Sequence, residues 1–108
     1  MATDLVFLLD TSSGVGKANF AKMQEFVGRI VKNFDMDSRM SKFSVITYDT
    51  QARLDIKFSD FSTEASFLKR LNELEYSAGK ATRIDFALVK ASEAFFAENG
   101  ARDNVKKV

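Results

Sequence analysis

The stretch that decides the fold of this 108-residue chain is Leu5-Val6-Phe7-Leu8-Leu9-Asp10-Thr11-Ser12-Ser13-Gly14. Its apolar part, up to Leu9, shows no polar alternation, which is typical of a strand that helices cover on both faces of a parallel sheet. The residues from Thr11 to Gly16 are mostly small and polar, which is typical of a loop. In sheets of this kind ligands bind beyond the carboxyl ends of the strands, so Asp10 stands where a binding site is expected.

The next two strands along the chain are predicted to form a hairpin. Residues 43–48 are a second largely apolar run, and residues 52–58 alternate between apolar and polar side chains, as a half-exposed strand does. Asp49, Thr50 and Gln51 form a turn too short for a crossover, so the two strands are expected to be antiparallel. Residues 52–58 would then form the edge of the sheet.

Three segments carry apolar residues at the spacing of a helix with one face in the core. These positions are Phe20, Met23, Val27, Ile30, Val31 and Phe34, then Phe67, Leu68, Leu71 and Leu74, and finally Ile84, Ala87, Leu88, Ala91 and Phe95. Ser62 or Thr63 can cap the second helix, and Asn99-Gly100 is expected to end the third. Residues 105–108 are a candidate start of a further strand. The order β-α-β-β-α-α indicates an α/β fold.

Composition excludes several classes of function. The chain has the size of one domain, and 45% hydrophobic with 29% charged residues fits a globular protein. A net charge of +1 with scattered Lys and Arg predicts no nucleic-acid partner. No run approaches the about 20 apolar residues of a membrane span. Because the chain has neither Cys nor His, the usual nucleophile–base pairs are missing and an enzyme is not expected.

We considered two kinds of binding site for the polar stretch after the first strand. Ser13-Gly14-Val15-Gly16-Lys17-Ala18 is superficially similar to a phosphate-binding loop. That pattern needs Gly at position 11 and Ser or Thr at position 18, where this chain has Thr11 and Ala18, so nucleotide binding is not expected. A carboxylate followed by hydroxyl groups suits a hard cation instead, although Asp and Ser also form ordinary turns and helix caps.

Four segments, in order and with matching spacing, resemble the von Willebrand factor type A domain. Residues 4–14 resemble its opening strand and its D-x-S-x-S metal-site motif, and residues 79–88 resemble the segment that supplies the metal-site threonine. Tyr48-Asp49 follows the second strand as it often does in the family, and residues 99–104 resemble the loop before the fourth strand. The chain is most similar to the adhesive, extracellular matrix type of the family, as in collagens and matrilins.

The resemblance implies a metal-ion-dependent adhesion site (MIDAS) that is only partly kept. Asp10 and Ser12 match the first two motif positions, and Thr82 matches the threonine of the second segment. Gly14 stands where the family has its second serine, and the family's aspartate after the fourth strand has no counterpart. Asp85 is expected to face solvent or cap a helix. Since Mg²⁺ prefers about six oxygen ligands, we expect Mg²⁺, Mn²⁺ or Ca²⁺ to bind weakly or not at all to this chain alone.

The resemblance also implies a single, partial von Willebrand A domain over residues 1–108. It would be a Rossmann-like sheet with flanking helices, containing the first three strands and first helices of the family fold. One edge of the central opening strand would lack a partner, which predicts self-association, pairing with a complementary segment, or a place in a longer protein. The implied function is an extracellular protein-binding adhesion module, secreted or in an ectodomain, whose ligand is collagen or another matrix protein. The alternative, favoured by Gly14, is a structural matrix domain that associates without metal.

Overall fold

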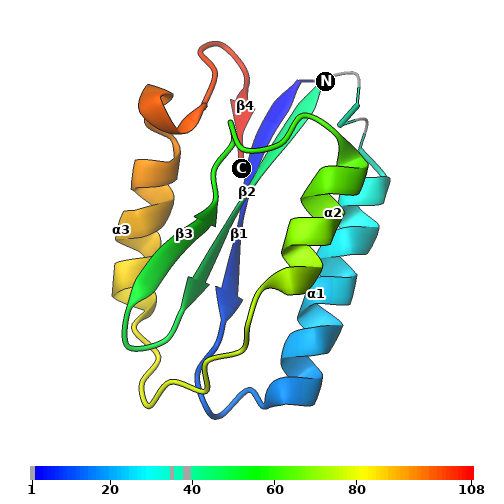
Figure 1. Ribbon diagram of the computed structural model, residues 1–108. Helices are drawn as coiled ribbons and strands as arrows, with labels where there is room; N and C mark the ends of the chain where they lie inside the picture. The colour runs from blue at the N-terminus through cyan, green and yellow to red at the C-terminus, as the bar shows by residue number, and fades with distance from the viewer. Residues whose placement is uncertain (1, 35, 38–39) are drawn as a thin grey trace.

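The described residues of the computed structural model, 2–34, 36–37 and 40–108, form the α/β architecture that the sequence predicts. Along the chain the elements are β1 (Thr3–Asp10), α1 (Lys17–Lys32), β2 (Ser41–Tyr48), β3 (Ala52–Ile56), α2 (Glu64–Glu73), α3 (Ile84–Ala94), a 3-10 helix (Ala97–Asn99) and β4 (Lys106–Lys107). Figure 1 shows three layers, with α3 on one face of the sheet and α1 and α2 on the other. The predicted order of elements is confirmed, and the candidate strand near residue 108 is the two-residue β4.

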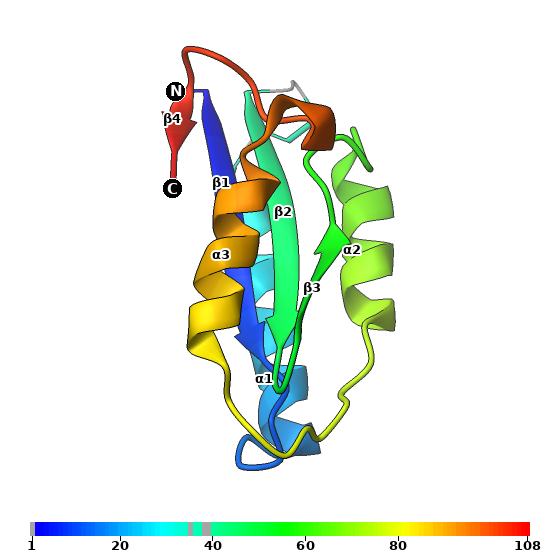
Figure 2. The same cartoon turned by 90° about the vertical axis from the view of Figure 1, so that its left-hand side faces the viewer.

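The sheet has the strand order β3-β2-β1-β4, which can be followed in Figure 2. β1 and β2 pair in parallel along their whole length, from Thr3 opposite Ser41 to Asp10 opposite Tyr48. β3 pairs antiparallel with β2 and has no further neighbour within the described sheet, so the predicted hairpin at the sheet edge is confirmed. The parallel pairing brings the carboxyl ends of β1 and β2 to the same edge of the sheet.

β3 is shorter than the sequence predicts. It ends at Ile56 rather than at Phe58. A turn stops it, because the Asp60 carboxylate accepts a hydrogen bond from Lys57 N at 2.8 Å and Asp60 N donates to Lys57 O at 3.1 Å. Phe58 is nevertheless buried, with its ring centroid 5.6 Å from that of Phe95. The alternating pattern therefore identified a buried residue correctly but continued past the end of the strand.

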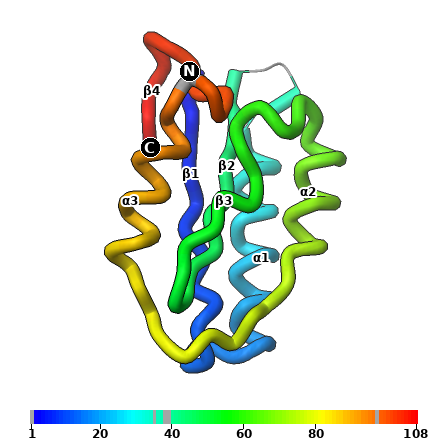
Figure 3. The backbone as a smooth tube through the Cα atoms, turned by 60° about the vertical axis from the view of Figure 1, so that its left-hand side comes forward, coloured from blue at the N-terminus to red at the C-terminus, as the bar shows by residue number. Residues whose placement is uncertain are grey.

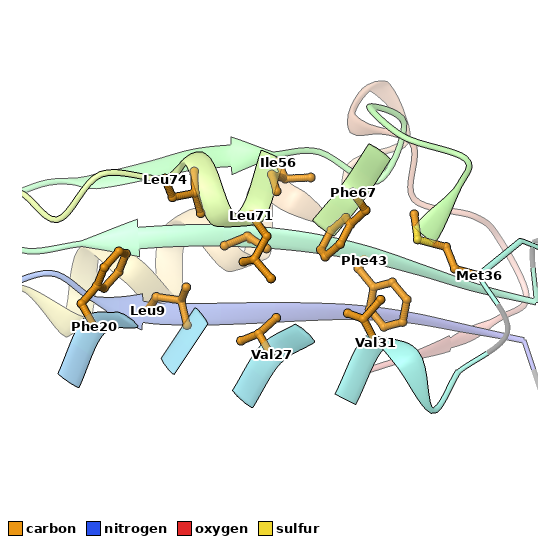
Figure 4. Close-up of a cluster of buried hydrophobic side chains, with 11 residues drawn as sticks. Leu9, Phe20, Val27, Val31, Met36, Phe43, Ile56, Phe67, Leu71 and Leu74 are labelled. Atoms are coloured by element: carbon orange, nitrogen blue, oxygen red, sulfur yellow. The ribbon is translucent and has the colours of Figure 1, made fainter. Parts of the chain in front are cut away.

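The larger core lies between the sheet and the helices α1 and α2 (Figure 4). Its buried members are Leu9, Phe20, Val27, Val31, Met36, Phe43, Val45, Ile56, Phe67, Leu71 and Leu74. Of the predicted α1 stripe, Phe20, Val27 and Val31 are buried in this core and Met23 packs against it, whereas Phe34 is 37% exposed. Because α1 ends at Lys32, Phe34 no longer follows the helical period, and its ring meets Phe43 edge-on with the centroids 5.8 Å apart.

α3 contacts the core with only part of the face that the sequence predicts, because Ala91 and Phe95 pack against the core but two larger residues of that face do not. Its buried residues are Ala87 and Ala94, whereas Ile84 and Leu88 are 55% and 59% exposed. The helix is apolar around most of its circumference, so spacing alone cannot identify the side that contacts the sheet. The outer side of α3 is therefore a broad exposed apolar surface. In the described ranges, no helix has both the length and the apolar character that crossing a membrane requires.

The predicted end of the third helix near Asn99-Gly100 marks the end of the 3-10 helix instead. α3 itself stops at Ala94, and the 3-10 helix follows after two residues, Phe95 and Phe96. Gly100 has a φ of +90°, and a Cβ at this position would lie 2.5 Å from the main-chain nitrogen of Ser59. Glycine is thus required here by both conformation and space, which is why the sequence signal was strong although it belonged to another element.

The open edge of β1 begins where β4 ends. β4 pairs with the first two residues of β1, and Val6 N then donates to Val108 O at 2.8 Å. In a parallel pair, alternate residues direct their main-chain groups to the same neighbour, and Asp4 and Val6 direct theirs to this edge. Leu8 continues the alternation past β4, so its N–H and C=O have no strand partner among the described residues. The predicted open edge is therefore confined to the second half of β1.

A buried carboxylate ties the two ends of the chain together. Asp4 is fully buried and accepts hydrogen bonds from Arg102 N at 2.8 Å, Arg102 Nη2 at 2.8 Å and Lys107 Nζ at 3.2 Å. Burial by itself raises the pKa of the Asp4 carboxyl, but the hydrogen bonds from Arg102 and Lys107 outweigh it and hold the pKa below its ordinary value. Asp4 thereby fixes β4 and the loop before it against the start of β1.

The substitution Asp4→Asn is expected to lower the free energy of unfolding at pH 7 by about 3 kcal/mol, because two cations lose a buried partner. The folded pKa of Asp4 lies below the unfolded value of about 3.9, so its contribution is complete above that value and is lost as the pH falls through the folded pKa. Urea unfolding at neutral and strongly acidic pH measures this. Asp103→Asn, which removes the same charge from an exposed position, is the control. Equal stability of the wild type and Asp4→Asn at pH 7 would contradict the assignment.

Candidate metal site

The strand ends gather at one end of the molecule. Figure 1 shows the carboxyl ends of β1 and β2, the start of α1 and the segment between α2 and α3 at this end, and Figure 3 shows the same arrangement from another side. We call the three residues that the sequence predicts as metal ligands, Asp10, Ser12 and Thr82, the strand-end site. Asp10 is the last residue of β1 and therefore lies at this end, where sheets of this class bind ligands.

The loop after β1 holds Asp10 and Ser12 in a tight turn. Ser12 N donates to Asp10 Oδ1 at 2.8 Å, and Asp10 Oδ2 accepts no hydrogen bond from the described residues. Ser12 is only 6% exposed, yet its hydroxyl also makes no hydrogen bond within this part of the chain. Every fully buried side-chain nitrogen or oxygen of the described residues has a partner, so the Ser12 hydroxyl must reach solvent-accessible space. A carboxylate oxygen and a hydroxyl group that remain unpaired in one tight turn are oxygen ligands of the kind that a hard cation prefers.

The segment between α2 and α3 is fastened to this loop by main-chain hydrogen bonds. Ser13 N donates to Gly79 O at 2.7 Å, and Gly79 N donates to Thr11 O at 3.1 Å. Together they form a parallel bridge between Ser12 and Gly79. The pairing of strands thus continues, by one short bridge, beyond the sheet itself and into the loops that carry the strand-end site.

Thr82 lies between two fixed points of this segment. One is Gly79, and the other is Arg83, whose main-chain N donates to Asp49 O at 2.7 Å. The Thr82 side chain is exposed and makes no hydrogen bond with any described residue, the other two residues of the strand-end site included. The structure therefore brings the segment of Thr82 next to the loop of Asp10 and Ser12, without joining the three side chains directly.

Asp49 lies under these loops and collects hydrogen bonds from several of them. Its Oδ2 accepts from Thr11 Oγ1 at 3.0 Å, from Arg53 Nη2 at 3.0 Å and from the Ser77 hydroxyl. Its Oδ1 accepts from Gln51 N at 3.2 Å and from Arg53 Nη1 at 3.3 Å. We call Asp49, Thr11, Arg53 and Ser77 the Asp49 network. Hydrogen bonds from Arg53 above all hold the pKa of the Asp49 carboxyl far below its usual range, against the opposing effect of burial.

Two tyrosines frame the same loops. The Tyr76 hydroxyl donates to Ser12 O at 2.6 Å and accepts from Gly16 N at 3.0 Å, so it clamps both ends of the turn between β1 and α1. Tyr48 is buried at the end of β2, opposite Asp10. Burial raises the pKa of the Tyr48 phenol, and the negative charge of Asp10 raises it further.

Gly14 and Asp85, which are not expected to be metal ligands, are both exposed. Gly14 is exposed and offers no side-chain oxygen. Asp85 is exposed and forms a two-point ion pair with Arg83, at 3.0 Å and 2.7 Å. In the part of the chain that the structure describes, no group of three or more His, Cys, Asp or Glu residues is placed to hold a metal ion.

Sequence patterns do not identify the residues that hold these loops together. Asp49 was assigned to a turn, and Arg53, Ser77 and Tyr76 received no interpretation as contacts. Arg53 and Asp49 are four residues apart, but Ser77 lies 28 residues from Asp49 and Tyr76 lies 64 from Ser12, and spacing cannot reveal such distant pairs. One signal was available, because Asp49 directly follows the strand that neighbours β1, and parallel strands end at the same edge.

Comparison with known proteins identifies the family of this chain. The family model of the von Willebrand factor type A domain matches residues 4–108. Human von Willebrand factor A domain-containing protein 2 is 30% identical over 98% of this chain, which spans 14% of that protein. Human cochlin is 32% identical over 72% of the chain, and mouse integrin alpha-M is 28% identical over 98% of it. The matched parts are 14% of cochlin and 9% of integrin alpha-M, so the chain corresponds to a small part of these relatives.

Solved structures show the same fold. Proximal thread matrix protein 1 from the mussel byssus superimposes with a TM-score of 0.92 at 24% identity, covering 99% of this chain and 29% of that one. A structure of the same protein with a zinc-occupied MIDAS motif gives a TM-score of 0.90 at 22% identity, covering 98% of this chain and 29% of that one. Likenesses at this identity establish the fold alone. Since the family model covers residues 4–108, however, this chain belongs to the von Willebrand factor type A domain family.

Proposed function

We propose that residues 1–108 act as one von Willebrand A domain unit that binds an extracellular protein through a divalent cation at the end of β1. Asp10, Ser12 and Thr82 hold the cation, and a carboxylate of the ligand completes its coordination shell. The observation that carries this proposal is the pair of oxygens at the strand end, Asp10 Oδ2 and the Ser12 hydroxyl, that no described residue engages. Oxygen donors of this kind are the ones that Mg²⁺, Mn²⁺ and Ca²⁺ prefer.

The strand-end site fits such a cation incompletely. Mg²⁺ requires about six oxygens in nearly octahedral geometry, whereas the site supplies one carboxylate and two hydroxyl groups. Gly14 contributes no oxygen, so water molecules and the ligand must supply the rest. When bound, the cation would provide a positive charge and an open position for a ligand carboxylate. We therefore expect weak binding by the chain alone, with a dissociation constant of about a millimolar or higher.

Family membership and the named relatives support an adhesive role outside the cell. The matches include integrin alpha-M and cochlin, and the fold is that of a byssal matrix protein with a MIDAS motif. The proposed partner is accordingly collagen or another matrix protein, and the proposed location is extracellular, either secreted or in an ectodomain. The second candidate, a structural matrix domain that associates without metal, rests on one observation, the absence of a side chain at Gly14.

Isothermal titration with Mg²⁺, Mn²⁺ and Ca²⁺ is expected to show weak binding that Asp10→Ala abolishes. Gly14→Ser is expected to tighten it about tenfold, because the new hydroxyl adds a ligand worth about 1.4 kcal/mol. The substitution is sterically free, since a Cβ at Gly14 would have no atom within 4 Å. Gly14→Ala is the matched control without a hydroxyl.

Two outcomes of this titration would count against the proposal. Micromolar binding by the wild type that is lost in Asp10→Ala would contradict the expected weak affinity, although it would support the proposed location of the site. Equal affinity of Gly14→Ser and Gly14→Ala would show that position 14 does not face the cation.

The adhesive role itself is tested by binding to immobilised fibrillar collagen. With Mg²⁺ present, the wild type is expected to bind, and both EDTA and Asp10→Ala are expected to remove the bound protein. Binding that survives EDTA and tolerates Asp10→Ala would favour the metal-free structural domain. A chain that does not bind collagen with or without Mg²⁺ would exclude this partner.

We also propose that the chain alone pairs with a second copy. The unpaired N–H and C=O of Leu8 offer a template for strand pairing, and the exposed apolar side of α3 lies in the layer above the same sheet. Size-exclusion chromatography with light scattering is expected to show a dimer at high concentration that dissociates on dilution. A monomer with one sharp unfolding transition at all concentrations would contradict this.

A further inference from the structure

The Asp49 network is more elaborate than a turn requires. Asp49 lies between β2 and β3, and a hairpin turn of this length needs no buried charge. Its carboxylate nevertheless reaches three separate segments: the loop after β1 through Thr11, the start of β3 through Arg53, and the segment before α3 through Ser77. Thr11 is fully buried and Asp49 is 3% exposed, so the hydrogen bond between them is shielded from solvent, whereas Arg53 is half-buried and Ser77 is exposed. Shielding strengthens the hydrogen bonds and makes a missing partner costly.

The segment that carries Thr82 lies directly on Asp49. A Cβ added to Gly79 would lie 2.7 Å from Asp49 Oδ2, so this position has room for glycine only. On the other side of Thr82, Arg83 N donates to the main-chain oxygen of Asp49 at 2.7 Å. Both fixed points around Thr82 therefore depend on where Asp49 stands.

Asp49 is unsuited to bind a cation itself. Both carboxylate oxygens already accept hydrogen bonds, and the guanidinium of Arg53 compensates the negative charge at 3.0 Å. The same guanidinium donates to Thr11 Oγ1 at 2.9 Å, so the charges and the loop are locked into one unit. Releasing Asp49 to a metal would take from Arg53 and Thr11 the carboxylate to which both donate.

We propose that Asp49 is the positioning residue of the strand-end site: through Thr11, Ser77, Gly79 and Arg83 it sets the distance between the Thr82 segment and the loop of Asp10 and Ser12. The inference that Asp49 serves cation binding rests on the proposed function, whereas the contacts of Asp49 with the two loops do not depend on it. The Asp49 carboxylate thus holds the ligand residues in place, so the strand-end site is preorganised before a cation binds.

The test compares Asp49→Asn with Asp55→Asn by amide hydrogen exchange and by Mn²⁺ affinity. Asp55 is a matched control, because its carboxylate also accepts from a neighbouring hydroxyl, Thr47 Oγ1 at 2.5 Å, but contacts neither loop. In Asp49→Asn, the amides of Ser13, Gly79 and Arg83 are expected to exchange about tenfold to a hundredfold faster, as the loss of a charged hydrogen bond implies. Amides of β2 should keep their rates. Asp55→Asn should leave the linking amides unchanged.

Mn²⁺ affinity separates positioning from a general loss of stability. Both substitutions are placed in the Gly14→Ser chain, whose affinity is expected to be easier to measure. Asp49→Asn should weaken Mn²⁺ binding at least about tenfold, in line with the exchange effect, and Asp55→Asn should not. If Asp49→Asn does not fold, Ser77→Ala, which removes one donor to Asp49, should show the same pattern with about a threefold effect.

Different failures lead to different conclusions. Unchanged exchange of the three linking amides in Asp49→Asn, or faster exchange of all amides to the same degree, would overturn the positioning role. If Gly14→Ser binds no Mn²⁺ at all, the proposed cation-dependent function falls, while the exchange comparison still decides whether Asp49 positions the Thr82 segment.

Discussion

The parallel pairing of β1 with β2 is the interaction on which the rest of the structure depends. The two strands match residue for residue from Thr3 and Ser41 to Asp10 and Tyr48. The pairing then continues one step beyond the sheet, because Thr11 N donates to Tyr48 O at 2.8 Å. This step brings Thr11 to Asp49 and so connects the sheet to the loops above it. A shift of register by one residue would turn every apolar side chain of β1 to the opposite face and separate Asp10 from Tyr48.

Much of the fold could be predicted from local sequence patterns, because the order of strands and helices depends on interactions between residues close in the chain. The uninterrupted apolar run before Asp10 marks a covered strand, and the short gap between two strands forces an antiparallel hairpin. Thr63, one of two candidate caps, does cap α2, where its hydroxyl accepts from Ser66 N at 3.3 Å. Such features depend on neighbours within a few residues, which a single sequence displays directly.

What could not be predicted depends on contacts between distant segments. The face of α3 was predicted only in part: Ala87 is buried as expected, but Leu88 is exposed, since a helix that is apolar around most of its circumference does not show which side meets the sheet. The Asp49 network was not foreseen, because Thr11 and Ser77 lie 38 and 28 residues from Asp49. The three residues of the strand-end site were named from a motif. Only the structure shows that Thr82 approaches through the main-chain bridge at Gly79 rather than by a side-chain contact.

At the strand-end site, the residues that hold the loops in place differ from the residues that are available to a ligand. The buried Asp49 and the half-buried Tyr76 fix the loops, whereas Asp10 Oδ2 and the hydroxyl groups of Ser12 and Thr82 make no hydrogen bond with the described residues and remain available to a ligand. Paramagnetic broadening of amide signals by Mn²⁺ tests this most directly, since it reports the location of even a weakly bound ion. The signals of Ser12, Ser13 and residues 80–83 should broaden first, while those of β4, at the opposite end of the molecule, keep their intensity. Broadening centred elsewhere, or none near Ser12 at millimolar Mn²⁺, would contradict a cation site at the end of β1.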